Sequence, residues 1–130
     1  MTEFFPISTL RSLILHHIAL IDRSDTYNTH EFALLFLKMA DFDNLDIKRS
    51  IQIIFRDSDI IFNVGENYII LLPKTNWNGA FELLKGLQEF LDQEFQDSIV
   101  TFPDDGGCAD GLLDSFKNVV KKYYDIELDF

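Results

Sequence analysis

Three stretches of the chain place apolar residues at the three- and four-residue spacing of an amphipathic helix. The first covers residues 8–22, with Ser8 as the expected N-cap. The second begins at Asn76 and reaches toward Phe95, and the third begins at Asp110, which we expect to cap it. The three apolar stripes are Leu10, Leu13, Ile14, Ile18 and Ile21; Ala80, Leu83, Leu84, Leu87 and Leu91; and Leu112, Leu113, Phe116, Val119, Val120 and Tyr123.

The first of these helices is apolar on more than one side. Leu15, Ala19 and Leu20 lie outside its main stripe. A helix with two apolar faces has two surfaces to cover. We therefore expect one face to pack on the sheet of this chain. We expect Leu15, Ala19 and Leu20 to form an interface with a partner protein or with a second copy.

Continuous apolar runs predict the strands. Residues 32–39 are apolar apart from Lys38 and indicate a buried strand. Residues 60–64 and 68–72 flank a short polar turn that contains Gly65, which is a hairpin signal. The second strand of this hairpin ends at a proline, which cannot donate to a strand ladder.

Three further segments complete the predicted elements. Residues 98–102 form a short strand, and the tail, residues 125–130, alternates Ile126, Leu128 and Phe130 with acids, which predicts an edge strand. A helix is expected between the first strand and the hairpin. Its apolar face is Ile47, Ile51, Ile54 and Phe55.

The order of these elements predicts an α+β fold. The six middle elements form a ferredoxin-like βαββαβ core, with an extra N-terminal helix before it and a C-terminal helix and strand after it. We expect one domain over residues 1–130, with the N-terminal helix and a loop in residues 1–31 and the core in residues 32–130. This topology occurs in proteins of many functions, so it says little about activity.

Composition and charge limit the classes of partner that this chain is expected to bind. A chain of 130 residues fits one domain, and its formal net charge is −11. Because nucleic-acid and anionic-membrane surfaces attract basic proteins, we expect neither as a partner. No apolar run approaches a membrane span, and no secretory signal is expected. The single cysteine, Cys108, has no partner for an internal disulfide, which fits a cytoplasmic location.

The segment from Arg56 to Pro73 resembles a known family. Its Arg-x-x-Asp corner, apolar strand, tight turn and second strand are similar to the core of GGDEF domains, the diguanylate cyclase family. The sequence Phe102-Pro103-Asp104-Asp105-Gly106 is similar to the family's Pro-x-Asp-Gly loop before its last helix. The resemblance covers residues 32–122 with a gap, and implies a nucleotidyl cyclase/GGDEF-like fold.

The signature turn departs from the family pattern. The resemblance aligns Gly65 with a retained glycine, Glu66 with a metal-binding carboxylate and Tyr68 with the final aromatic residue. Val64 replaces the first glycine, and Asn67 stands where a second carboxylate belongs. A β-branched residue resists the conformations open to glycine and blocks close approach of a phosphate. The turn Val64–Tyr68 is therefore interpreted as a degenerate signature.

The first strand admits two registers against the family's metal-binding position. In the first, Lys38 occupies that position and no metal is expected. In the second, Asp41 and Asp43 supply carboxylates that could join Glu66 around magnesium. We prefer the first register, because the second buries Lys38 inside a central strand at a high desolvation cost. In both, the segment before Arg56 is shorter than in the family and lacks its nucleotide-holding helix.

Arg56 and Asp59 resemble the family's inhibitory site, which implies binding of cyclic dimeric GMP by the arginine fork. The alternative is local: Arg56 caps the preceding helix while Asp59 pairs at a strand start.

Taken with the signature turn, these residues favour a non-catalytic signalling or interaction domain that acts by protein binding, without a cofactor. The rival is an enzyme, a shortened magnesium-dependent nucleotidyl cyclase or other phosphotransferase that uses Asp41, Asp43 and Glu66. A third hypothesis is a ferredoxin-like scaffold with an accidental likeness to the family.

Overall fold

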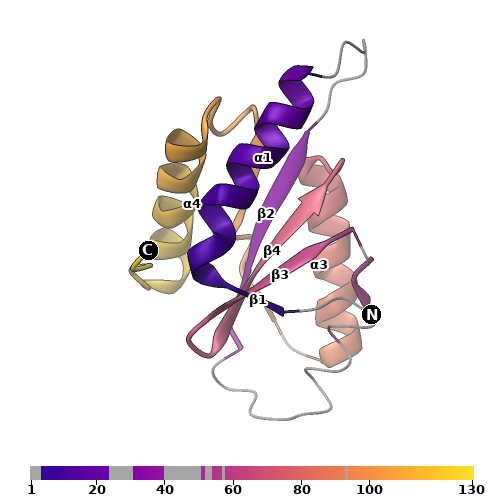
Figure 1. Cartoon of the computed structure of the whole chain (residues 1–130). Helices are drawn as coiled ribbons and strands as arrows, with labels where there is room; N and C mark the ends of the chain where they lie inside the picture. Colours follow the sequence, from indigo (N-terminus) through magenta and orange to yellow (C-terminus); the bar gives the residue numbers. More distant parts are fainter. Residues whose placement is uncertain (1–3, 24–30, 40–50, 52–53, 57, 93) are drawn as a thin grey trace.

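Five strands form one mixed sheet in the order β1-β3-β4-β2-β5 (Figure 1). The computed structural model describes residues 4–23, 31–39, 51, 54–56, 58–92 and 94–130. β1 runs parallel to β3, and the other neighbours are antiparallel. The order β3-β4-β2-β5 is that of a ferredoxin-like sheet, so the predicted α+β class is confirmed. The strands are β1 (Phe4–Pro6), β2 (Phe32–Leu37), β3 (Ile60–Val64), β4 (Asn67–Pro73) and β5 (Ile99–Phe102).

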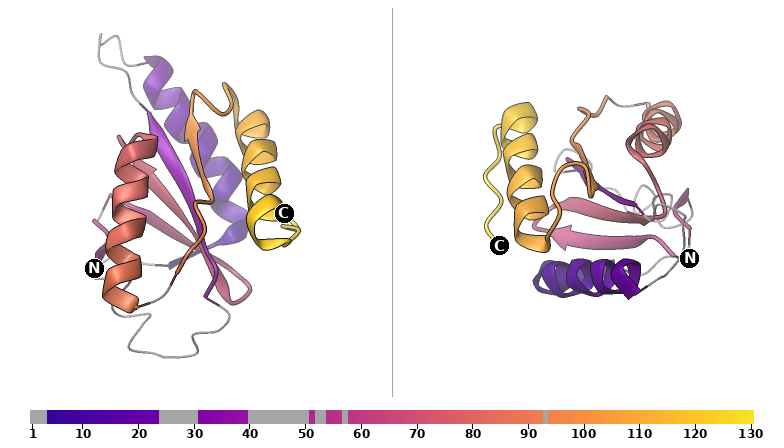
Figure 2. Two further views of the ribbon diagram at one scale, coloured as in Figure 1. Left: turned by 180° about the vertical axis from the view of Figure 1, so that it is seen from behind. Right: turned by 90° about the horizontal axis from the view of Figure 1, so that it is seen from above.

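Helices cover both faces of this sheet. α1 (Leu10–Arg23) and α4 (Ala109–Tyr124) lie on one face, and α3 (Trp77–Leu91) lies on the other (Figure 2). Two separate clusters of buried side chains fill the space between the layers, one on each face. A short 3₁₀ turn, Ile7–Thr9, precedes α1. Among the helices that the structure describes, none is long and apolar enough to cross a membrane.

β2 explains why the chain contains one continuous apolar run. All six of its residues are buried: Leu34 and Phe36 point into the cluster under α1 and α4, while Leu35 and Leu37 point into the cluster under α3. A strand covered on both faces needs apolar residues at every position. β2 ends at Leu37, two residues earlier than predicted, and Lys38 follows it half-buried. The desolvation argument for preferring the Lys38 register therefore does not hold, because Lys38 lies past the covered strand.

The N-terminal strand β1 was not predicted. Phe4, Phe5 and Pro6 pair with Ile61, Phe62 and Asn63 of β3 and so cover one edge of the ferredoxin-like sheet. The Phe4 ring stacks on the Tyr68 ring with the centroids 5.2 Å apart. Pro6 is the last residue of the strand, where the lack of an N–H donor interrupts the fewest hydrogen bonds between β1 and β3.

The predicted C-terminal strand is wrong. Residues 125–130, which are all described, form no strand and instead lie alongside α4 (Figure 2). Their alternating apolar side chains pack against the α1–α4 side of the core. The alternation thus reflects burial of one side of an extended segment on a helix, without a neighbouring strand.

Two predicted helix starts are also wrong. Ser8 lies in the 3₁₀ turn, and α1 begins at Leu10. The N-cap of α4 is Cys108, whose Sγ accepts from the Gly111 N–H at 3.4 Å, whereas Asp110 lies in the first turn. Asp110 instead accepts from Nε of Arg11 of α1 at 3.0 Å, and this contact lowers the pKa of the Asp110 carboxyl below its ordinary value.

The helix predicted before Arg56 falls largely outside the described residues. Ile51 and Phe55, which are described, are buried under the α3 side of the sheet, and Ile54 is half-buried beside them. Their burial agrees with the predicted apolar face.

Candidate functional site

The signature hairpin closes with a two-residue turn. Val64 of β3 pairs with Asn67 of β4, so Gly65 and Glu66 form the turn. Gly65 has φ of 59°, which favours glycine over other residues. Val64 lies in the strand and packs, half-buried, against the core. The retained glycine therefore serves the turn, and Val64 needs no glycine-like conformation.

Asn67 connects this hairpin to the end of the first strand. Its Oδ1 accepts from the Met39 main-chain N–H at 2.8 Å. Leu37 of β2 is paired with Tyr68, so the end of β2 and the signature turn lie at the same end of the sheet. The position that resembles the family's second carboxylate thus holds a neutral amide whose oxygen is used in a fold contact. Burial raises the pKa of the neighbouring Tyr68 phenol above its ordinary value.

The described charged residues at this end of the sheet are Lys38 and Glu66. Glu66 is exposed in the turn, and Lys38 follows the last residue of β2. Within the described part of the chain, no three acidic, histidine or cysteine side chains form a group that could hold a metal ion. Asp41 and Asp43, the alternative metal ligands, lie outside the described residues.

Arg56 and Asp59 bond to each other. Arg56 Nη2 donates to Asp59 Oδ1 at 2.9 Å, and Arg56 Nε and the Arg56 main-chain N–H donate to Asp59 Oδ2 at 3.2 and 2.9 Å. The Asp59 N–H returns a bond to the Arg56 carbonyl at 2.9 Å. Asp59 is 3% exposed, whereas the Arg56 side chain is 58% exposed. The corner is therefore a structural tie at the start of β3, and its arginine still reaches the surface.

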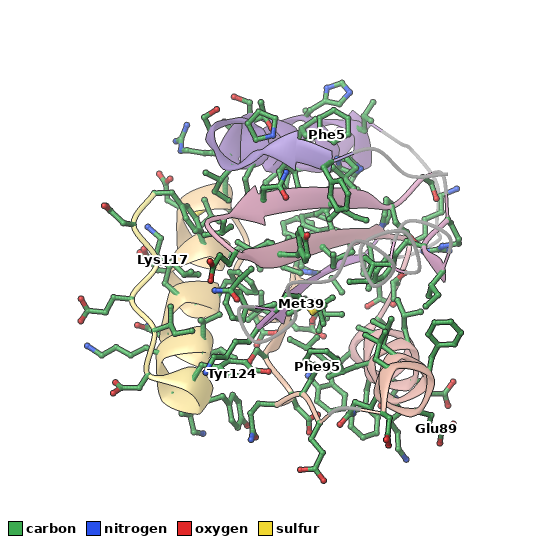
Figure 3. All side chains as sticks on the ribbon, turned by 90° about the horizontal axis from the view of Figure 1, so that it is seen from below. Phe5, Met39, Glu89, Phe95, Lys117 and Tyr124 are labelled. Carbon is green, nitrogen blue, oxygen red and sulfur yellow. The ribbon has the colours of Figure 1, made fainter. Side chains whose placement is uncertain are left out.

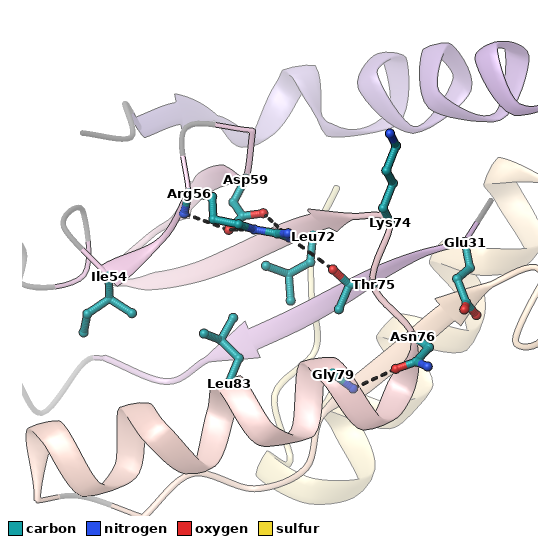
Figure 4. A pocket seen from close by; sticks show the side chains of 10 residues that line it. All are labelled: Glu31, Ile54, Arg56, Asp59, Leu72, Lys74, Thr75, Asn76, Gly79 and Leu83. Carbon is teal, nitrogen blue, oxygen red and sulfur yellow. Dashed lines mark hydrogen bonds and ion pairs between the residues drawn. The ribbon is translucent and has the colours of Figure 1, made fainter. Parts of the chain in front are cut away.

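The same arginine reaches the end of β4. Arg56 Nη2 donates to the Pro73 carbonyl at 3.3 Å and to Thr75 Oγ1 at 3.2 Å. These bonds hold the loop between β4 and α3 against the corner (Figure 4). Asn76 then caps α3, because its Oδ1 accepts from the Gly79 N–H at 2.8 Å.

A hollow of about 380 Å³ lies beside this corner. Figure 4 shows that the segment before β3, the end of β4 with the loop after it, and α3 supply its walls. Lys74, at its rim, has φ of 51° and an exposed side chain. Charges of both signs and apolar side chains line the hollow: Glu31, Ile54, Arg56, Asp59, Leu72, Lys74, Thr75, Asn76, Gly79 and Leu83. Arg56 and Lys74 bring two positive charges to this lining, and Glu31 and Asp59 bring two negative charges.

The predicted interface residues of α1 are exposed. Leu15 is 43% exposed, Leu20 is 52% exposed, and Ala19 lies on the same outer side. Leu20 and the neighbouring residues His17, Ile21, Phe32 and Pro73 also border an apolar hollow of about 280 Å³. The opposite side of α1 inserts Leu10 and Ile14 into the core. The two apolar faces expected from the sequence are thus present.

One exposed aromatic residue, Phe90, was missed by the sequence reasoning. Phe90 near the end of α3 is 63% exposed, more than either leucine of α1. Lys74 was also missed as a residue of the hollow at Arg56. Its position directly after Pro73, which ends the strand, is the sequence signal that could have indicated it. Trp77 is 40% exposed and stacks on Phe81, with the ring centroids 5.1 Å apart.

Comparison with known proteins supports the fold and gives no match at the level of sequence families. No protein-family model and no curated protein matches the sequence. Among solved structures, the chain is similar to a sensory box/GGDEF family protein from Caulobacter crescentus CB15, with a TM-score of 0.65 and 15% sequence identity. The match covers 95% of this chain and 95% of that chain. At this identity the likeness shows the fold, and the fold of this chain is GGDEF-like over nearly its whole length.

Proposed function

We propose that this chain is a non-catalytic GGDEF-like domain that acts by binding protein, with α1 as the binding surface. The main support for a lack of catalytic activity is the hydrogen bond from the Met39 main-chain N–H to Asn67 Oδ1. A two-metal phosphoryl-transfer site needs several anionic oxygens converging on the ions. Here an amide occupies one such position and is engaged with the main chain, which leaves Glu66 as the turn's one carboxylate.

The outer side of α1 supports the protein-binding part. Leu15, Ala19 and Leu20 are exposed on α1, and Leu20 borders the hollow at Phe32. Burial of a fully exposed leucine contributes about 1.5–3 kcal/mol, so each of these half-exposed leucines would contribute roughly half of that. From Leu10 to Ile21 the helix has no acidic residue, although the chain as a whole carries a net charge of −11. Repulsion between two copies is therefore weakest along this helix, which favours self-association through it.

Replacing Leu15 and Leu20 by glutamine is expected to weaken self-association at least tenfold. Loss of two buried leucines removes more than the roughly 1.4 kcal/mol that corresponds to a factor of ten. Light scattering over a concentration series measures the molecular mass. Phe90→Gln is the matched control, since Phe90 is exposed on α3, away from this surface. A wild-type chain that stays monomeric at all concentrations contradicts self-association, and equal loss in the control contradicts the assignment to α1.

The hollow at Arg56 supports a second candidate, binding of cyclic dimeric GMP. Arg56 and Lys74 line it together, and both side chains reach solvent. Because Asp59 already bonds to Nε and Nη2 of Arg56, a ligand has to share the guanidinium with this carboxylate. Lys74 offers a second cation without disturbing that pair.

Titration calorimetry distinguishes the nucleotide hypotheses. We expect cyclic dimeric GMP to bind the wild type and to lose at least tenfold in affinity in Lys74→Ala, since an ammonium beside a phosphate contributes about 1.5–3 kcal/mol. Arg56→Ala should lose more, and Lys85→Ala, on α3, should match the wild type. Absence of binding heat at high micromolar cyclic dimeric GMP rejects this candidate.

An activity assay tests the rival enzyme hypothesis. With GTP and magnesium, the wild-type chain should give no turnover. Turnover that disappears in Glu66→Ala would revive the shortened cyclase that uses Asp41, Asp43 and Glu66.

A further inference from the structure

The C-terminal segment, residues 125–130, folds back along α4 as an extended strap. Asp125 ends the helix in the left-handed conformation, with φ of 55°, and its N–H donates to the Lys121 carbonyl at 2.8 Å. The chain then runs beside α4 in both views of Figure 2. No strand pairing holds it to the described part of the sheet. The strap is therefore held by its contacts with the helix that it follows.

The strap has an apolar side and an acidic side. Ile126, Leu128 and Phe130 are half-buried against the core cluster that includes Phe116 and Val120 of α4. Asp125, Glu127 and Asp129 alternate with them and are exposed. This is the period of two expected for an extended peptide with one side bound.

Two lysines of α4 contact the strap at separate points. Lys117 Nζ donates to the main-chain oxygen of Phe130 and lies 4.7 Å from the centroid of the Phe130 ring. Figure 3 labels Lys117 on the side of α4 that faces the C-terminal segment. Lys121 Nζ donates to Glu127 Oε1 at 2.6 Å. The two lysines are four residues apart, so both project from the same side of the helix. The bond to Lys121 lowers the pKa of the Glu127 carboxyl below its ordinary value.

These contacts define a recognition surface, which we call the strap groove: Lys117, Lys121 and the apolar side chains of α4 under Ile126, Leu128 and Phe130. It contacts three features of the strap: the apolar side chains at every second position, the acid Glu127 between them, and the aromatic ring of Phe130. In a chain of net charge −11, Lys117 and Lys121 give this surface two positive charges. The groove therefore complements an acidic peptide by charge as well as by shape.

We propose that the strap groove of α4 is a docking site for an extended peptide with alternating acidic and apolar residues, and that residues 125–130 occupy it as a displaceable competitor. The Lys121 and Glu127 side chains are 55% and 79% exposed, and exposed ion pairs stabilise weakly. The backbone of the strap has no ladder bonds to break. A partner peptide of the same chemistry can therefore replace the strap without any change in the sheet.

The probe is a fluorescein-labelled peptide with the sequence of residues 125–130, Asp-Ile-Glu-Leu-Asp-Phe. Its binding to the full-length chain is followed by fluorescence anisotropy. In the wild type the strap competes at the high effective concentration of a tethered ligand, so binding should be weak. Leu128→Asp puts a charge at a half-buried position and weakens the strap, so the peptide should bind this variant about tenfold more tightly.

Substitutions of lysines on α4 are made in the Leu128→Asp chain. Lys117→Gln and Lys121→Gln should each weaken peptide binding at least tenfold. Lys122→Gln is the matched control and should leave binding unchanged, because the Lys122 ammonium lies 5.4 Å from the Tyr123 ring centroid and makes no strap contact. Thermal unfolding followed by circular dichroism checks that each variant is folded.

Three outcomes would overturn the proposal. Equal affinity of the peptide for the wild type and Leu128→Asp means that strap and peptide do not compete. Equal binding of a peptide with grouped residues, Asp-Glu-Asp-Ile-Leu-Phe, means that charge alone governs binding. Absence of binding to every folded variant removes the docking site. None of these results bears on self-association through α1, which is measured separately.

Discussion

Gly106→Ala is expected to destabilise the fold by about 3 kcal/mol, the upper end of the cost of inserting a group into a packed site. A Cβ atom at Gly106 would lie 2.5 Å from the Leu112 nitrogen and 2.7 Å from the Leu112 Cα. Both are main-chain atoms in the first turn of α4, so no side-chain rotation relieves the overlap. Leu112 is fully buried, and its displacement would disturb the core between α4 and the sheet.

Gly107→Ala is the matched control for this substitution. A Cβ at Gly107 would have no atom within 4 Å, and the residue lies in the same loop. Both variants change the entropy of the unfolded chain to the same extent, so their difference reports the folded-state overlap. Urea denaturation gives both free energies of unfolding. A difference below about 0.5 kcal/mol would mean that the loop adjusts without displacing α4.

The loop that contains Gly106 also protects one edge of the sheet. Asp105 Oδ2 accepts from the Thr101 main-chain N–H at 2.8 Å, and the Asp105 N–H donates to the Thr101 carbonyl at 2.8 Å. These bonds occupy groups of β5 that an added strand would need. The acids and glycines of residues 103–107 thus have a structural use. The outer edge of β5 is therefore engaged within the chain at Thr101.

The predicted sheet was correct where the sequence signal and the fold share a physical cause. The continuous run of β2 follows from helices on both sides of the sheet, and the hairpin at Gly65 follows from a turn that needs glycine. β1 was missed because three residues are too short to show a period. The tail was misassigned because alternation shows that one side is buried and does not show what covers it. The place of Asp110 depends on Arg11, 99 residues away, and no local pattern encodes such a pair.

The candidate site was predictable in part. The sequence located the Arg56–Asp59 corner, the turn at Gly65 and the exposed residues of α1, since each depends on nearby residues. It could not show that Asn67 bonds to Met39, because that contact joins segments 28 residues apart in the chain. The strap groove was equally hidden. In the sequence, Lys117 and Lys121 are typical of a solvent-exposed helix face. Only the folded position of the tail shows that both lysines contact it.

Asp59→Asn is expected to cost about 2–4 kcal/mol of folding free energy, since it removes one partner of a charge pair whose carboxylate is buried. The carboxylate accepts three bonds from Arg56. In asparagine, an NH2 group replaces one of the two carboxylate oxygens. A hydrogen-bond donor of the side chain would then face an N–H donor of Arg56. The guanidinium would then lack a counter-charge at the corner that joins β3 to the end of β4.

Asp110→Asn provides the exposed counterpart for the same measurement. Arg11 and Asp110 also form a pair at 3.0 Å, but their side chains are 57% and 72% exposed. Water and salt screen such a pair, so its loss should barely change unfolding by urea. Equal losses for both variants would show that burial of Asp59 adds nothing and that its bonds to Arg56 are easily exchanged. The Arg56 guanidinium would then be released to a phosphate at little cost, which would favour cyclic dimeric GMP at this corner. A large loss for Asp59→Asn alone assigns Arg56 first to the fold.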